Sequence, residues 1–209
     1  MMKKILYFCL LLSALAICGT ADAVVMDFED QTLGTPYIVG NSFAASGVSI
    51  SVSQFQPLVG PPLSGSAVVT NTGKAGGVGK ELFITNVDLD FLFDFSGCPS
   101  CGVALLFGEY GEDNNLGINL GINGDLQKAE DFYGLPGVIG GANVYVATRG
   151  GNLGTMLIVS GVNINTLTIG GEEVAIDTVF ACETVPEPAT ITLLGLGALS
   201  VFAGRKRRN

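Results

Sequence analysis

The chain has 209 residues, 48% of them hydrophobic, and a formal net charge of −9 at neutral pH. Its acidity excludes the charge attraction on which nucleic-acid binding depends, so no nucleic-acid partner is expected. The sequence contains no histidine and no tryptophan. It therefore lacks the commonest general base, the commonest metal ligand and the best aromatic platform for cations.

The N-terminal residues 1–23 have the features of a secretory signal peptide. Two lysines precede an apolar run that is shorter than the ~20 residues of a membrane span. The small residues of Ala21-Asp22-Ala23 mark a signal-peptidase site, so the mature chain is predicted to begin at Val24. An alternative is lipidation at a cysteine, because Leu15-Ala16-Ile17-Cys18 resembles a lipoprotein cleavage box.

Residues 24–184 are predicted to form one domain, large enough for a core of its own. They include 17 acidic and four basic residues, so the net charge of this segment is near −13. Apolar and polar residues alternate along Val48–Ser53 and again along Val87–Phe95. The strand expected at Val87–Phe95 should turn its apolar residues to the core and its aspartates, including Asp90, to solvent.

Further short strands are separated by turn signals rich in glycine and proline. They are expected at Val24–Glu29, Ser66–Asn71, Glu81–Thr85, Val103–Glu109, Leu116–Ile122, Asn143–Thr148, Thr155–Val159, Val162–Ile169 and Val174–Cys182. This spacing indicates an all-β fold, an antiparallel β-sandwich. The one helical segment is expected at Asp125–Phe132.

Three cysteines remain in the mature segment, and export to an oxidising compartment favours a structural disulfide. Cys98 and Cys101 can close a tight loop, or either can pair with Cys182. The Cys-x-x-Cys spacing is also that of redox enzymes, but here it follows a strand instead of opening a helix. A structural bridge is therefore predicted, with its pairing left open.

Two tyrosines are candidate glycan contacts, because a tyrosine offers a flat ring and a polar hydroxyl. Tyr110 and Tyr133 are the pair with asparagine and glycine nearby in sequence. The acidic cluster Glu109–Asn115 lacks the ligand spacing of an EF-hand and is interpreted as a solvated hairpin loop. The segment Lys74–Lys80 resembles a phosphate-binding loop but lacks its first glycine, and Glu81 replaces the magnesium-binding hydroxyl.

The C-terminal residues 185–209 have three parts. Pro186-Glu187-Pro188 interrupts regular structure, and the apolar stretch Thr190–Gly204 that follows is near the lower length limit of a transmembrane helix. The chain then closes with the basic cluster Arg205, Lys206, Arg207 and Arg208, followed by one asparagine. This cluster is expected to stay cytoplasmic while residues 24–184 lie outside.

These three parts, in this order and behind a signal peptide, resemble the PEP-CTERM sorting signal over about the last 25 residues. The resemblance implies a Gram-negative bacterium that makes exopolysaccharide. It also implies that an exosortase, a membrane-embedded cysteine protease, removes the tail after signal peptidase has acted. An inner-membrane-anchored intermediate would then yield a cell-surface or extracellular protein. A plain membrane anchor is the alternative.

The two ends of the central domain are similar to carbohydrate-binding-type jelly rolls. Val25–Asp30 opens the domain, and Ala175–Val179 belongs to its last strand. In such jelly rolls the terminal strands are neighbours, and carboxylates on them hold a structural calcium ion. The resemblance therefore implies Asp27, Glu29 and Asp177 as calcium ligands.

Taken alone, the sequence predicts an exported, non-enzymatic protein of the cell surface or matrix, associated with exopolysaccharide and biofilm. One alternative is a lectin-like glycan-binding module with structural calcium. The other is a glycoside hydrolase that uses two carboxylates, although no pair of acidic residues is singled out as catalytic.

Overall fold

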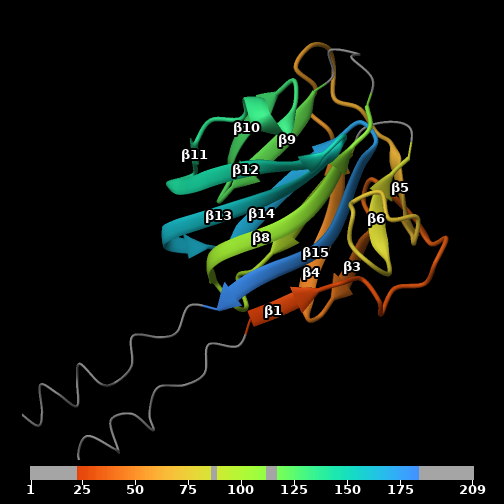
Figure 1. Cartoon of the computed structure of the whole chain (residues 1–209), viewed down its shortest axis with the longest axis horizontal. Coiled ribbons are helices and arrows are strands. Elements are labelled where there is room, and N and C mark those ends of the chain that lie inside the picture. Colours follow the sequence, from red (N-terminus) through yellow and green to blue (C-terminus); the bar gives the residue numbers. More distant parts are fainter. Residues whose placement is uncertain (1–22, 86–88, 112–116, 184–209) are drawn as a thin grey trace, which may run out of the picture. The chain divides into compact units, whose positions relative to one another are not determined.

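The alternation of apolar and polar residues is realised as strands in the computed structural model, which describes residues 23–85, 89–111 and 117–183. These residues form fifteen strands and one short 3-10 helix, η1 (Phe132–Gly134). All strand pairs are antiparallel, and the strands form two sheets (Figure 1). The predicted all-β, antiparallel architecture is confirmed.

The larger sheet has nine strands in the order β11-β12-β13-β8-β15-β6-β5-β2, with β1 paired to β15. Their bounds are β1 (Ala23–Met26), β2 (Pro36–Ile38), β5 (Ser66–Thr70), β6 (Glu81–Ile84), β8 (Ser100–Glu109), β11 (Val138–Ile139), β12 (Ala142–Gly150), β13 (Leu153–Ile164) and β15 (Val174–Glu183).

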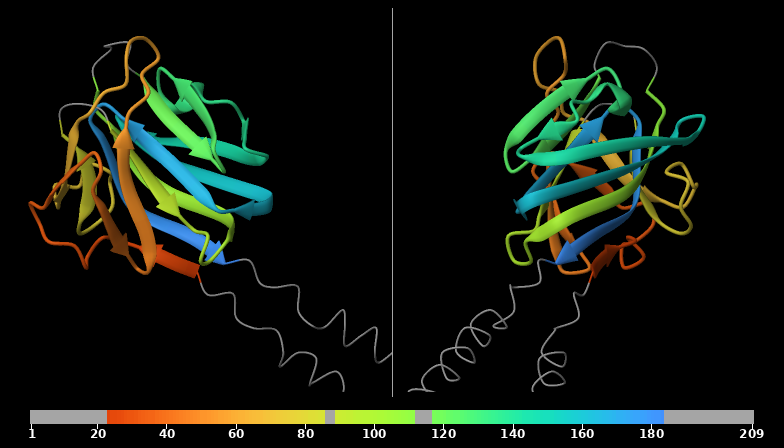
Figure 2. Two further views of the ribbon diagram at one scale, coloured as in Figure 1. Left: turned by 180° about the vertical axis from the view of Figure 1, so that it is seen from behind. Right: turned by 60° about the vertical axis from the view of Figure 1, so that its left-hand side comes forward.

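The smaller sheet has six strands in the order β10-β9-β14-β7-β4-β3 and faces the viewer in the left panel of Figure 2. Their bounds are β3 (Ser42–Ala45), β4 (Val48–Gln54), β7 (Leu89–Asp94), β9 (Ile118–Ile122), β10 (Asp125–Ala129) and β14 (Thr166–Gly171).

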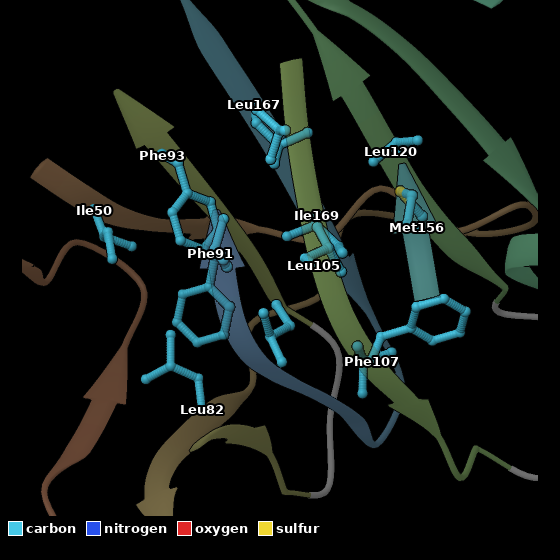
Figure 3. Packing of buried hydrophobic residues seen from close by; sticks show 14 of the residues in the cluster. Ile50, Leu82, Phe91, Phe93, Leu105, Phe107, Leu120, Met156, Leu167 and Ile169 are labelled. Atoms are coloured by element: carbon cyan, nitrogen blue, oxygen red, sulfur yellow. The ribbon is translucent and has the colours of Figure 1, made fainter. Parts of the chain in front are cut away.

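The core lies between the two sheets, where each strand turns its apolar side inward. Phe91 and Phe93 of the smaller sheet lie near Leu105 and Phe107 of the larger one, and all four are essentially inaccessible to solvent (Figure 3). Burying one such side chain contributes about 1.5–3 kcal/mol. The unit Ala23–Thr184 thus contains a core of its own and is able to fold without the rest of the chain.

The helix predicted at Asp125–Phe132 is wrong. Its first part is strand β10, which pairs with β9 in a hairpin. The two residues between these strands, Asn123 and Gly124, have φ angles of 53° and 85°. Positive φ at both positions is the property of a tight hairpin turn, and Asn-Gly is the sequence that favours it. Only Phe132 of the expected helix is helical, in η1.

Four other features differ from the predicted strands. The short strands β2, β3 and β11 were not expected, and each lies at or beside the edge of its sheet. In addition, β13 continues through Gly161 to Ile164, where a break between two strands was predicted. The chain instead turns at Asn165, whose carbonyl accepts a hydrogen bond from the Phe95 N–H (2.7 Å).

The first and last strands are neighbours. Ala23 pairs with Cys182, so both ends of the described domain leave it at one side. At the other end of β15, Val174 pairs with Glu109 of β8. Because β15 has ten residues, these two poles are about 30 Å apart. Within the described ranges, no helix is long and apolar enough to cross a membrane, and the predicted signal peptide and C-terminal helix lie outside those ranges.

Candidate functional site

The outward face of the six-stranded sheet is hollowed into an open groove of about 640 Å³. It crosses strands β10, β9, β14, β7 and β4, because residues of all five line it. The polar and small residues that matter most are Ser53, Gln54, Gln56, Asp90, Gly121 and Thr168. Asp90 is the one charged residue in the lining, although the domain as a whole is strongly acidic.

The groove follows from the residues at the outward positions of the strands. In β4, serines alternate with the buried Val48, Ile50 and Val52. In β9, the outward Gly121 lies against Thr168 of β14, and a Cβ at this glycine would meet the threonine side chain at 3.1 Å. Small outward side chains leave the sheet surface uncovered, so the strands themselves form the floor.

Asp90 was expected to face solvent, and this expectation is wrong, because its side chain is 2% exposed. Asp90 of β7 pairs with Gly170 of β14, and Gly170 pairs with Asn119 of β9, so the three residues form one row across the sheet. The Asn119 Nδ2 donates to both carboxylate oxygens of Asp90, at 3.1 and 3.0 Å. A Cβ at Gly170 would overlap Asp90 Oδ1, so only glycine fits between the two polar residues.

The environment of Asp90 raises its pKa to about 7. Burial is the main cause, and the Asn119 hydrogen bond and the positive charge of Lys128 oppose it. The Oδ1 atom of Asn119 is itself buried and has no hydrogen-bond partner in the described part of the chain. The floor of the groove therefore carries a carboxyl group that changes its charge near neutral pH, beside an unused acceptor.

A second hollow, of about 560 Å³, lies around Tyr133, one of the two predicted glycan contacts. Its lining includes Leu58, Lys128 and Asp131, and the Tyr133 side chain is 46% exposed. Lys128 belongs to β10, and its Nζ donates to the Pro57 carbonyl (3.2 Å). The ring of Tyr133 is therefore accessible to a ligand.

Glu109 at the end of β8 has a raised pKa of about 7. Burial is the first cause, the hydrogen bond from the Phe132 N–H (3.4 Å) opposes it, and the charge of Asp131 raises it further. Glu109 lies in the segment that was interpreted as a solvated hairpin loop. Residues 112–116 of that segment lie outside the described ranges, whereas Glu109 belongs to a strand.

Tyr110, the other predicted glycan contact, is engaged within the protein. Its hydroxyl donates to the Lys74 carbonyl (2.7 Å), and the Lys74 ammonium group lies 4.7 Å from the centre of its ring. Burial raises the pKa of this hydroxyl, and the negative charge of Glu81 raises it further. The Tyr110 hydroxyl thus binds the backbone of the segment Lys74–Lys80 instead of pointing to a ligand.

The glycine-rich segment Lys74–Lys80 is folded around a buried carboxylate. Glu81 is 1% exposed and accepts hydrogen bonds from the N–H groups of Lys74 (2.9 Å) and Ala75 (2.7 Å) and from Thr72 Oγ1 (2.9 Å). A phosphate-binding loop offers such N–H groups to its ligand. Here Glu81 already occupies them, in agreement with the rejection of that function from the sequence.

The residues predicted to bind calcium lie in one region but have different partners. Asp177 is 1% exposed and accepts a hydrogen bond from Thr178 Oγ1 (2.9 Å). Burial raises its pKa, and the negative charges of Glu81 and Asp27 contribute to the increase. Asp27 accepts a hydrogen bond from the Glu29 N–H (3.2 Å).

Glu29, the third predicted ligand, is bound to Lys80. Its Oε1 accepts from the Lys80 N–H (2.7 Å), while the Lys80 ammonium group donates to the carbonyls of Glu29 (2.6 Å) and Gln31 (2.7 Å). An ammonium group thus lies among oxygens that could serve a cation. In the described residues, no group of three or more Asp, Glu, Cys or His is arranged to hold a metal ion. Calcium binding stays a prediction, and it requires Lys80 to move.

The predicted disulfide cysteines lie near the pole where the chain ends leave the domain. Cys101 is exposed at the start of β8, and Cys98 is half-buried in the preceding turn. The backbone of Cys182 on β15 pairs with Gly102, so all three cysteines belong to one region of the larger sheet. The pairing of these cysteines stays open.

The sequence did not predict four polar residues in or beside the groove, namely Gln54, Gln56, Asn119 and Thr168. The serine alternation of β4 was a usable signal, because it marks a strand whose outward face is polar but uncharged. The alignment of Asn119 with Asp90 is not visible in the sequence, because it depends on the register of two strand pairs.

The described residues form a two-sheet β protein with an open groove on its six-stranded sheet. A protein-family model for the PEP-CTERM protein-sorting motif matches residues 184–208, which contain the Pro-Glu-Pro triplet and the basic tail. The chain carries a PEP-CTERM sorting motif, and the motif indicates export, processing by an exosortase and sorting to the cell surface or extracellular space. Searches of curated proteins and of solved structures found no match.

Proposed function

We propose that this protein is a non-enzymatic component of the cell surface or extracellular matrix that associates with exopolysaccharide in biofilm. The groove across the six-stranded sheet is the proposed glycan-binding site. The observation that carries this proposal is the contrast between an acidic domain, near −13, and a groove in which one aspartate is the single charged residue among uncharged polar residues, glycines and the apolar Val39, Val52 and Leu126. Such a lining fits a ligand that is rich in hydroxyl groups.

The chemistry of the groove matches sugar hydroxyls, which both donate and accept hydrogen bonds. Gln54 and Gln56 each offer an amide donor and a carbonyl acceptor, and Ser53 and Thr168 add hydroxyl groups. Gly121 adds no side chain of its own to the floor, and the side chains of Leu126 and Thr168 border it. From β10 to β4 the groove crosses four strand spacings, about 19 Å, which suits a stretch of polymer.

The Tyr133 hollow extends this proposal in the lectin-like direction. A sugar ring that continues beyond the groove would stack on the exposed tyrosine. The lectin-like version also assigns the sandwich to the jelly-roll type, with calcium as a structural ion bound at Asp27, Glu29 and Asp177. Tyr133→Ala should then weaken glycan binding, whereas Tyr110→Ala should act through stability.

Hydrolysis is the second candidate function, and Glu109 is the observation that favours it. A carboxyl group with a pKa of about 7 beside a second carboxylate, Asp131, is the arrangement that general acid catalysis of glycoside cleavage needs. Release of reducing ends from exopolysaccharide, abolished by Glu109→Gln, would replace the non-enzymatic proposal.

The proposed route to the cell surface has two processing steps. Signal peptidase cleaves after Ala23, and the apolar stretch Thr190–Gly204 holds an inner-membrane intermediate until the exosortase acts. Mass spectrometry of the exported protein tests both steps. A mature N-terminus at Val24 and loss of the basic tail support the route, whereas an N-terminus at a lipidated Cys18 contradicts it.

The binding proposal is tested with purified residues 24–184 and exopolysaccharide from the producing strain. Wild-type protein should bind saturably, and the double variant Gln54→Ala/Gln56→Ala should bind at least about tenfold more weakly. Val78→Ala is the control, because Val78 is 92% exposed and lines neither hollow. Equal loss of binding in the control and the double variant would reject the groove as the site.

A further inference from the structure

The outward face of the larger sheet carries a row of apolar side chains that runs across five strands. Tyr145 of β12 pairs with Leu157 of β13, Leu157 with Ala104 of β8, Ala104 with Phe180 of β15, and Phe180 with Val25 of β1. Since directly paired residues of antiparallel strands project to the same face, these five side chains form one continuous row. The five strands lie side by side in Figure 1.

The row is open to solvent. Tyr145 is 58% exposed, Leu157 44%, Phe180 42% and Val25 39%. A neighbouring row in the same register adds Val159, which is 43% exposed and pairs with Gly102. Together these side chains expose on the order of 500 Å² of apolar surface, which is large for one patch on a monomer. We call these two rows the apolar stripe.

Another part of this face is covered by the protein itself. The segment Lys74–Lys80 lies over it: a Cβ at Gly108 of β8 would overlap the Lys74 carbonyl, and Arg149 Nη2 donates to the Gly76 carbonyl (3.1 Å). Asp177, on the outward side of β15, is buried against Gly77 of the same segment. The stripe therefore lies beside the part of the face that the glycine-rich segment covers.

The charge distribution identifies the partner that fits this surface. The domain carries a net charge near −13, so two copies repel each other along most approaches. Neither row of the stripe contains Asp, Glu, Lys or Arg. Contact through the stripe brings two copies together without placing carboxylates against carboxylates, and it removes apolar surface from water.

We propose that the apolar stripe is a self-association surface, through which two copies of this chain pack their nine-stranded sheets face to face. A two-fold axis along the strands at Ala104 places Tyr145 of each copy over Val25 of the other and Leu157 over Phe180. Both copies use the same patch, as a closed dimer requires. The pair buries about 1,000 Å², near the lower limit for a specific interface, so the dimer is weak and depends on concentration.

This arrangement goes beyond glycan binding and adds a structural role. The groove lies on the other sheet, so it stays accessible in both copies of the dimer. A dimer with two outward grooves can connect two polysaccharide chains, whereas a monomer binds one. Dimerisation does not depend on the groove, and its test needs no glycan.

The experiment is sedimentation equilibrium of residues 24–184 from about 10 μM to about 1 mM, with a reducing agent present so that Cys101 forms no cross-link. Wild-type protein should show a reversible monomer–dimer equilibrium. Added salt should strengthen it, because screening reduces the repulsion between two acidic copies.

Val159→Asp should weaken the dimer at least about tenfold, since it places a carboxylate in each half of the interface. Val78→Asp is the matched control: Val78 is 92% exposed outside the stripe, and the substitution adds the same charge. Thermal melts show that both variants are folded. The proposal is overturned if wild-type protein stays monomeric at 1 mM, or if Val159→Asp dimerises like the control.

Discussion

Replacing Asp90 by asparagine should stabilise the protein above neutral pH. The pKa of this carboxyl is about 7 in the folded protein, against 3.8 for an ordinary aspartate. Between pH 3.8 and about 7, the folded state therefore holds a proton that the unfolded state has lost. The free energy of unfolding falls as the pH rises through this range. The slope is about 1.4 kcal/mol per pH unit, and the full difference is on the order of 4 kcal/mol.

The asparagine variant removes this cost because it has no proton to lose. Its remaining amide oxygen can still accept one hydrogen bond from Asn119 Nδ2, which donates to both carboxylate oxygens in the wild type. At pH 8 we expect Asp90→Asn to be more stable than wild type by a few kcal/mol. At pH 5 the difference should be much smaller, because Asp90 is protonated in the folded wild type.

Urea denaturation at pH 5, 6, 7 and 8 measures the two stabilities. Burial also raises the pKa values of Glu109 and Asp177, but both residues are present in either protein and cancel in the difference. Asp94→Asn is the control, because hydrogen bonds from Ser96 lower the pKa of exposed Asp94, so its removal should give no stabilisation. A stability difference that does not grow from pH 5 to pH 8 would refute the reasoning.

Two further substitutions test the packing around the site. Gly170→Ala should lower the free energy of unfolding by about 1–3 kcal/mol because its Cβ would overlap Asp90, whereas Gly161→Ala, with open space around it, should have little effect in the same urea titration. Lys80→Ala should lower the free energy of unfolding by about 1–2 kcal/mol, because the hydrogen bonds to the carbonyls of Glu29 and Gln31 are lost. Calcium should raise the melting temperature more in Lys80→Ala than in wild type; an equal response would place any calcium site elsewhere.

Much of the fold could be predicted because burial on one side of a sheet imposes a period of two on the sequence. Val48–Gln54 and Leu89–Asp94 follow this rule closely. Pro36–Ile38 and Ser42–Ala45 could not be found in this way, because three or four residues are too few to establish a period. The hairpin at Asn123-Gly124 was detectable from its turn residues, but the following segment was interpreted as a helix.

The candidate site was less predictable, because it depends on which strands are neighbours. Asp90 occupies an outward position and would be solvated on most sheets. Here it is buried, since Asn119 and Gly170 lie beside it and the segment around Pro57 continues the wall of the groove. Tyr110 and Tyr133 were selected by residue type and by nearby asparagine and glycine, and of these two only Tyr133 is both exposed and beside a hollow.

The most direct test of glycan binding is an NMR titration of residues 24–184 with oligosaccharides from the producing strain's exopolysaccharide. We expect saturable chemical-shift changes in the backbone amides of the groove residues Ser53, Gln54, Gln56 and Thr168. The amides of β12 and β13 on the other sheet should not move. Shifts confined to Tyr145 and Leu157, or no shifts at millimolar oligosaccharide, would contradict the central claim.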